Sequence, residues 1–155
     1  MINFNETTPA APAGGINVIP QNDGSGNMSF YVPQSPAVNE LALTRQTADV
    51  AATTLVTPTV ASRYRVTVYI IITTADPASS TLGAVELAWS DGDNSNAQTL
   101  ALTATSTGNS LTTFKTGTAL VNGAASTPIK ISTSGYVSNT PATMAFSLYV
   151  EYELM

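Results

Sequence analysis

Hydrophobic and polar residues alternate along residues 63–72 (RYRVTVYIII). In an extended chain, one set of side chains lies on one side of the backbone: Tyr64, Val66, Val68, Ile70 and Ile72. The other set lies on the opposite side: Arg63, Arg65, Thr67, Tyr69 and Ile71. A period of two residues is typical of a β-strand with one buried face. The segment therefore predicts a long strand whose first set of side chains faces a core.

The same alternation recurs in four later segments, residues 85–89, 98–102, 129–131 and 144–152. Leu87, Leu100, Ile131 and Phe146 are among the positions expected to face inwards. Gly, Asn, Asp and Pro separate these segments, and no helical crossover is visible between them. Residues 39–56 fit neither period well and are interpreted as strand or irregular. The pattern predicts an all-β fold, an antiparallel β-sandwich or jelly roll.

Residues 1–36 have a different character, because Pro, Gly, Asn and Ala dominate and little could build a core. Residues 16–19 and 28–32 flank a polar loop that contains Asp23 and Gly24, a turn signal that predicts a small hairpin. An isolated hairpin is only marginally stable in water, so this one needs a surface to lie against. We therefore expect an extended N-terminal arm, residues 1–36, followed by a β-sandwich domain, residues 37–155.

Charge is scarce in this chain, since 10% of its residues are charged against roughly 25% in an average soluble domain. Ten acidic residues and five scattered cations give a net charge of −5, so we expect no nucleic-acid partner. The longest apolar run, Val66–Ile72, is too short to span a bilayer, and the N-terminus lacks a secretory signal pattern. We expect synthesis in the cytoplasm, no membrane partner, and a surface partly covered by another subunit.

Residue types that carry chemistry are few. The chain has no His and no Cys, and it lacks a phosphate-binding glycine loop. We therefore expect no enzymatic activity, no catalytic residue and no cofactor. The sharpest cluster is residues 91–96 (DGDNSN), where Asp91, Asp93 and Ser95 match the first ligands of a calcium loop. The twelfth position is Leu102 and not Glu, so a hairpin loop is the favoured interpretation and no metal site is expected.

Aromatic residues fall into two groups. Most occupy positions expected to face the core: Tyr64, Trp89, Phe114, Phe146 and Tyr152. The remaining candidates for exposure are Tyr69, Tyr136 and Tyr149, which could form a sugar-binding platform or a subunit contact.

Two charged pairs share strand faces. Arg63 and Arg65 are expected to be solvated or ion-paired rather than to bind an anion. Glu151 and Glu153 are expected to be solvated charges that discourage pairing along the edge of a sheet.

The arm resembles the N-terminal segment of many tailed-phage virion proteins. The resemblance lies in residues 3–14 (NFNETTPAAPAG), in Asn17-Val18 and in residues 23–33 (DGSGNMSFYVP). The Thr-, Ala- and Gly-rich strands beyond residue 60 also look like phage decoration and fibre-head domains. The resemblance implies a virion structural protein, of the capsid-decorating, cementing or short-fibre type, and it carries no catalytic residues onto this chain.

These observations lead to one hypothesis and one alternative. The hypothesis is a capsid decoration protein, located in the virion, that docks through its arm on the major capsid protein or another virion protein and forms a homo-oligomer, expected to be a trimer. The expected docking residues are Phe4, Pro9, Pro12, Ile16, Val18, Phe30 and Tyr31. The candidate subunit contacts are Tyr69, Ile71 and Tyr149. The alternative is a glycan-binding β-sandwich module of a tail fibre or tail tip, with a glycan as partner.

Overall fold

A computed structural model describes residues 19–22, 28–31, 37–139 and 143–155. The chain divides into two units, Met1–Ser35 and Pro36–Met155, and each is described by itself. Across the described ranges, no helix is long and apolar enough to cross a membrane.

The first unit holds a two-stranded antiparallel sheet, β1 (Ile19–Asn22) and β2 (Met28–Tyr31). A hairpin is thus present, but its first strand lies three residues later than the predicted 16–19. The shift follows from pairing, because Asn22 opposite Met28 brings both strands up to the same loop. Five predicted docking residues lie outside the described residues: Phe4, Pro9, Pro12, Ile16 and Val18. Phe30 and Tyr31 lie in β2, where only the backbone is described.

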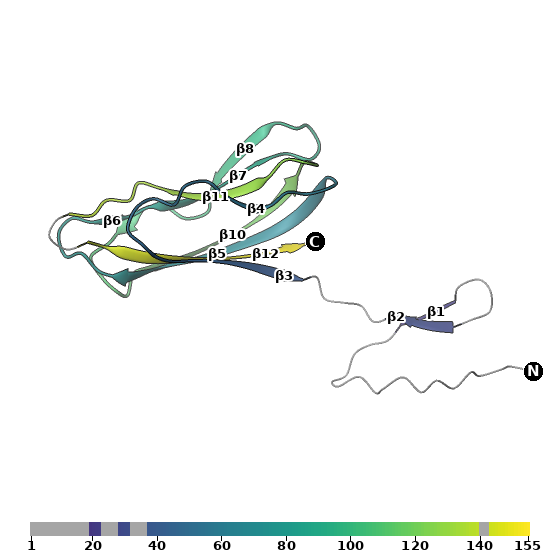
Figure 1. The fold of residues 1–155 in the computed structure, drawn as a ribbon, viewed down its shortest axis with the longest axis horizontal. Helices are drawn as coiled ribbons and strands as arrows, with labels where there is room; N and C mark the ends of the chain where they lie inside the picture. Colours follow the sequence, from purple (N-terminus) through teal and green to yellow (C-terminus); the bar gives the residue numbers. More distant parts are fainter. Residues whose placement is uncertain (1–18, 23–27, 32–36, 140–142) are drawn as a thin grey trace, which may run out of the picture. The chain divides into compact units, whose positions relative to one another are not determined.

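The second unit contains two four-stranded antiparallel sheets (Figure 1). The first sheet has the order β10-β5-β12-β3, with strands β3 (Val38–Gln46), β5 (Ser62–Thr74), β10 (Phe114–Gly123) and β12 (Ala145–Leu154). The second has the order β4-β11-β7-β8, with strands β4 (Thr53–Val56), β7 (Ala84–Ser90), β8 (Ala97–Ala101) and β11 (Ile129–Ser134). Two short strands, β6 (Thr81–Leu82) and β9 (Ser106–Thr107), form a separate pair.

The strand order defines the topology. Counted along the chain, the eight strands of the two large sheets fall in the orders 6-3-8-1 and 2-7-4-5. Consecutive strands lie in different sheets, except for the neighbours β7 and β8, and the last strand lies between the first and the third. This is the arrangement of a jelly roll, two antiparallel sheets packed face to face. The predicted all-β jelly roll is confirmed.

The core lies between the two sheets and follows the alternation in the sequence. The inward side chains of β5 are all buried, as predicted: Tyr64, Val66, Val68, Ile70 and Ile72. From β12, Phe146, Leu148 and Val150 are also buried, and Val85, Leu87, Ile129 and Ile131 face them from the second sheet. Burial of these side chains is the main force that holds the sheets together.

Two predicted core positions are exposed. Leu100 belongs to β8, which pairs only with β7 among the described residues and whose five residues are all exposed. Leu100 pairs with the buried Leu87 and so lies on the inner side of the sheet, yet it is 41% exposed, so alternation there does not lead to burial. Phe114 pairs with Ile71 on the outward side of the first sheet. Residues 39–56, interpreted from the sequence as strand or irregular, contain most of strand β3 and all of strand β4.

Residues 102–105 pack against the inner side of β10. The Lys115 ammonium donates hydrogen bonds to the carbonyls of Ala104 at 2.7 Å and Thr105 at 2.9 Å. At Gly117 a Cβ atom would lie 2.3 Å from the Leu102 carbonyl oxygen, so only glycine allows the backbones to come this close. Both contacts lie on the side of β10 that faces the other sheet, because Lys115 pairs with Ile70 and Gly117 with Val68, two buried inward residues.

Candidate functional site

The outer face of the sheet β10-β5-β12-β3 is the candidate site, and β5 carries its central row of side chains. Arg65, Thr67, Tyr69, Ile71 and Thr73 follow one another along the outward side of this strand. Arg65 and Thr67 line one pocket, and Thr73 lines another. The face therefore has a charged end, an aromatic middle and a hydroxyl-rich end.

Three aromatic rings cross the middle of the face. Tyr69 on β5 lies between Phe114 on β10 and Tyr149 on β12, with ring centroids 5.8 Å and 6.2 Å away. The rings are tilted by 34° and 36° relative to Tyr69, which suits aromatic contact. Phe114 is 58% exposed, Tyr149 42% and Tyr69 36%. We call these three side chains the aromatic row.

The aromatic row includes two of the three predicted contact residues. Tyr69 and Tyr149 are directly opposite in the register of β5 and β12, and Ile71 follows Tyr69 on the same side of β5. Phe114, which was assigned to the core, completes the row. Tyr136 does not belong to it, because its ring packs on Phe146 at 5.9 Å and its hydroxyl donates to the Met144 carbonyl. Tyr136 is half-buried against the core and so is not part of the exposed aromatic row.

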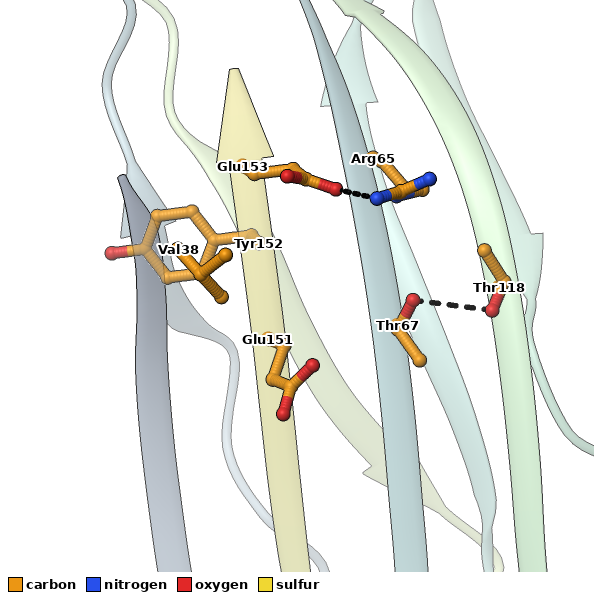
Figure 2. Close-up of a pocket in the computed structure, with 7 residues that line it drawn as sticks. All are labelled: Val38, Arg65, Thr67, Thr118, Glu151, Tyr152 and Glu153. Carbon is orange, nitrogen blue, oxygen red and sulfur yellow. Dashed lines mark hydrogen bonds and ion pairs between the residues drawn. The ribbon is translucent and has the colours of Figure 1, made fainter. Parts of the chain in front are cut away.

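The charged end of the face is a shallow pocket of about 300 Å³ (Figure 2). Arg65 on β5 and Glu153 on β12 point toward one another and form an ion pair. Beside them, the Thr67 and Thr118 hydroxyls meet across β5 and β10 at 3.2 Å. The ion-paired interpretation of Arg65 is confirmed.

The edge role predicted for Glu151 and Glu153 is wrong. Both residues lie on β12, which has β5 on one side and β3 on the other. A central strand has no free edge to protect, and Glu153 instead forms the ion pair with Arg65.

The hydroxyl-rich end is a second pocket, of about 390 Å³. We call it the Tyr149 pocket; its lining residues are Thr44, Arg45, Thr73, Thr74, Ser147 and Tyr149. A bulge in β3 shapes it, because Phe146 and Leu148 on β12 pair with Gln46 and Leu43, leaving an extra residue on β3. At the bulge Arg45 has a φ of 52°, in the left-handed region.

Asp76 has the most buried carboxylate of the described residues, and its oxygens accept hydrogen bonds that hold the fold. It accepts from the backbone N–H groups of Asn139 at 2.7 Å and Ala78 at 3.0 Å, and from the Ser138 hydroxyl at 3.0 Å. The Asn139 and then the Ala78 N–H hold the pKa of this carboxyl below its ordinary value; burial opposes that shift and Ser138 adds to it. Asp76 therefore ties residues 76–78 to residues 138–139.

In the loop at residues 91–96, side chains accept hydrogen bonds from the backbone of the same loop. It joins β7 to β8, as the hairpin interpretation predicts. The Asp91 carboxylate accepts from the Asp93 N–H at 3.0 Å, and the Asn94 side chain accepts from the Asn96 N–H at 2.9 Å. Such side-chain to backbone bonds are the usual reason for Asp and Asn in turns. Among the described residues, no cluster of three or more acidic side chains could hold a metal ion.

No protein-family model and no curated protein sequence matches this chain. Among solved structures, it is similar to the CBM22-1 xylan-binding domain of Xyn10C from Paenibacillus barcinonensis, at 12% identity and a TM-score of 0.40, over 92% of this chain and 83% of that one. It is also similar to the structure of infectious bursal disease virus Gx strain, at 15% identity and a TM-score of 0.41, over 90% of this chain and 36% of that one. The jelly-roll topology described above rests on the strand order and not on these likenesses.

Proposed function

We propose that this chain is a structural subunit of a phage virion, of the capsid-decorating type, and that its jelly roll self-associates through the aromatic row. The observation that carries the proposal is the row itself, Phe114, Tyr69 and Tyr149, together on one exposed sheet face. The jelly roll is an architecture that viral capsid domains share with lectins and cupins, which is an analogy of fold only.

The physical argument concerns the environment of the rings. Single exposed apolar side chains are ordinary, but a contiguous group indicates a contact surface. Tyr and Phe are enriched in the cores of protein interfaces, where they bring a large apolar area at a small cost in side-chain entropy. Half-buried Ile71 lies beside the row, and Leu120 is 68% exposed farther along β10. A second subunit would cover these side chains.

We further propose a closed ring of three subunits. In such a ring each subunit uses two different patches, and the aromatic row would supply one of them. Each arm, residues 1–36, would then bind the shell or a neighbouring subunit. Three weak attachments on one particle dissociate slowly, because release requires all of them to open together.

The molar mass in solution tests this proposal. Light scattering would compare the full chain with a chain that starts at Ala37, just before β3. We expect a trimer for the full chain and weaker association without the arm. A monomer in both cases would contradict the proposal.

A further inference from the structure

We propose that the Tyr149 pocket binds a sugar that carries a carboxylate. This inference is argued from the pocket and does not rest on the proposed self-association, although the two share Tyr149, which lines the pocket and also belongs to the aromatic row. The pocket opens at the hydroxyl-rich end of the outer face, where β3, β12 and β5 lie side by side. Its volume of about 390 Å³ falls in the range of small-molecule sites, roughly 300–1,000 Å³.

The lining of the pocket matches the chemistry of a pyranose ring. Thr44, Thr73, Thr74 and Ser147 line it, and a hydroxyl can both donate and accept a hydrogen bond, although the buried Ser147 hydroxyl already accepts the Arg45 N–H. Tyr149, an exposed aromatic residue, also lines the pocket. A sugar ring presents C–H groups on its faces and hydroxyls around its rim, so it can pack against an aromatic ring while its rim bonds to polar side chains.

Arg45 indicates the charge of the ligand. Among the described residues that line the pocket, Arg45 alone is charged. The carboxylates of this face, Glu151 and Glu153, line the pocket at the other end (Figure 2). A planar guanidinium with several N–H donors recognises a carboxylate through two parallel hydrogen bonds. The pocket therefore favours a uronic-acid or sialic-acid unit over a neutral sugar.

The backbone at Arg45 supports a role in binding. Its φ of 52° is a conformation that glycine adopts freely and that costs other residues energy, and bulges of this kind usually carry glycine. The Ser147 hydroxyl accepts a hydrogen bond from the Arg45 backbone N–H at 3.2 Å and so holds the bulge from the neighbouring strand. Ser79, Ser95 and Ser126 also have a positive φ, but of these four residues Arg45 alone lines the pocket.

An array of galacturonic-acid- and sialic-acid-terminated oligosaccharides, with galactose-terminated counterparts, tests the inference. We expect the full chain to bind at least one carboxylated saccharide and to bind its neutral counterpart less. The key variant is Arg45→Asn, because Asn tolerates the left-handed conformation and removes only the guanidinium. By titration calorimetry, it should bind the selected saccharide about tenfold to a hundredfold more weakly, the loss expected for a charge-assisted hydrogen bond.

Two control variants test whether a loss of binding comes from the pocket itself, from the lower net charge, or from a change in self-association. Arg63→Gln removes the same charge from an exposed arginine of β5 outside this pocket, and it should leave binding unchanged. Tyr69→Thr alters the aromatic row but no lining residue of the pocket, so a variant made monomeric by this change should still bind the saccharide. Binding by no array member, equal binding by Arg45→Asn, or equal loss in Arg63→Gln would overturn the inference.

Discussion

The two sheets of this jelly roll present different side chains to the outside. On the second sheet the outward positions of β7 and β11 hold small and polar residues: Ala84, Glu86, Ala88, Ser90, Lys130, Ser132 and Ser134. On the first sheet the corresponding central positions hold Tyr69, Ile71 and Tyr149, with Phe114 beside them. Both sheets bury aliphatic side chains on their inner faces.

The difference between the two sheets indicates that the fold requires the inner aliphatic side chains but not large side chains on its outer faces. The second sheet forms with Ala, Ser, Glu and Lys at these outward positions, so large aromatic side chains are not needed there to hold a strand in register. The inner faces provide the burial that stabilises the sandwich. The outward aromatic side chains are thus not required by the fold, which supports the proposed self-association.

The largest expected effect separates the two surfaces of a single strand. Phe146 and Tyr149 both belong to β12, but Phe146 is fully buried and Tyr149 is exposed. Phe146→Ala should lower the free energy of unfolding by about 3–5 kcal/mol, because it leaves a cavity between the sheets. Tyr149→Ala should cost about 1 kcal/mol or less in the monomer, as expected at the surface. Urea denaturation measures both values, and equal losses would contradict the distinction between inner and outer residues.

We expect a smaller change in the free energy of unfolding when Asp76 is replaced, a residue that lies on neither outer face. Asp76→Asn should lower the free energy of unfolding at neutral pH, because one of the two oxygens that accept N–H groups becomes an NH₂ donor. The folded-state pKa of Asp76 lies below its ordinary value. Its contribution is therefore complete above the unfolded pKa of about 3.9 and is lost as the pH falls through the folded pKa.

Denaturation at pH 7 and pH 2 measures this linkage. The difference between the wild type and Asp76→Asn should be largest at pH 7 and should shrink at pH 2. Asp93→Asn is the matched control, because Asp93 lies in an exposed loop and its replacement should change little. A difference that does not depend on pH would contradict the role of the Asp76 carboxylate.

The smallest expected effect is at the charged end of the first sheet. Arg65 and Glu153 form an ion pair in which the arginine side chain is 51% exposed, so water and salt screen the attraction. A double-mutant cycle with Arg65→Ala and Glu153→Ala should give a coupling of about 0.2–1 kcal/mol that weakens in high salt. A coupling of several kcal/mol would mean that the outer face of the first sheet contributes strongly to the stability of the fold. That result would contradict the comparison, in which the inner faces provide the stability.

Alternation predicts the inner surface of the sandwich well, because the period of two in β5 and β12 places the same side chains in the core that the structure buries. It fails at Leu100 and Phe114 for a common reason. The period assigns a residue to one side of its strand, but only the topology decides whether another sheet covers that side. Leu100 lies on an uncovered edge strand, and Phe114 lies on the outer side of β10.

The candidate site was predictable only in part. Tyr69, Ile71 and Tyr149 stand out in the sequence as large apolar residues at outward positions, and the register brings them together. The place of Phe114 in the row depends on the pairing of β10 with β5, which are about 50 residues apart in the chain. The Tyr149 pocket depends on a bulge at Arg45, and arginine gives no sequence signal for a left-handed backbone.

The molar mass of the double variant Tyr69→Thr/Tyr149→Thr, measured by light scattering beside the wild type, tests the central claim most directly. Thr suits an exposed strand, so the variant should stay folded. Leu100→Thr is the matched control, because Leu100 is also a large exposed apolar residue but lies on the second sheet. We predict an oligomer for the wild type and Leu100→Thr, and a monomer, or dissociation at more than tenfold higher concentration, for the double variant. A monomeric wild type, or an oligomer that the double variant leaves intact, would contradict the account.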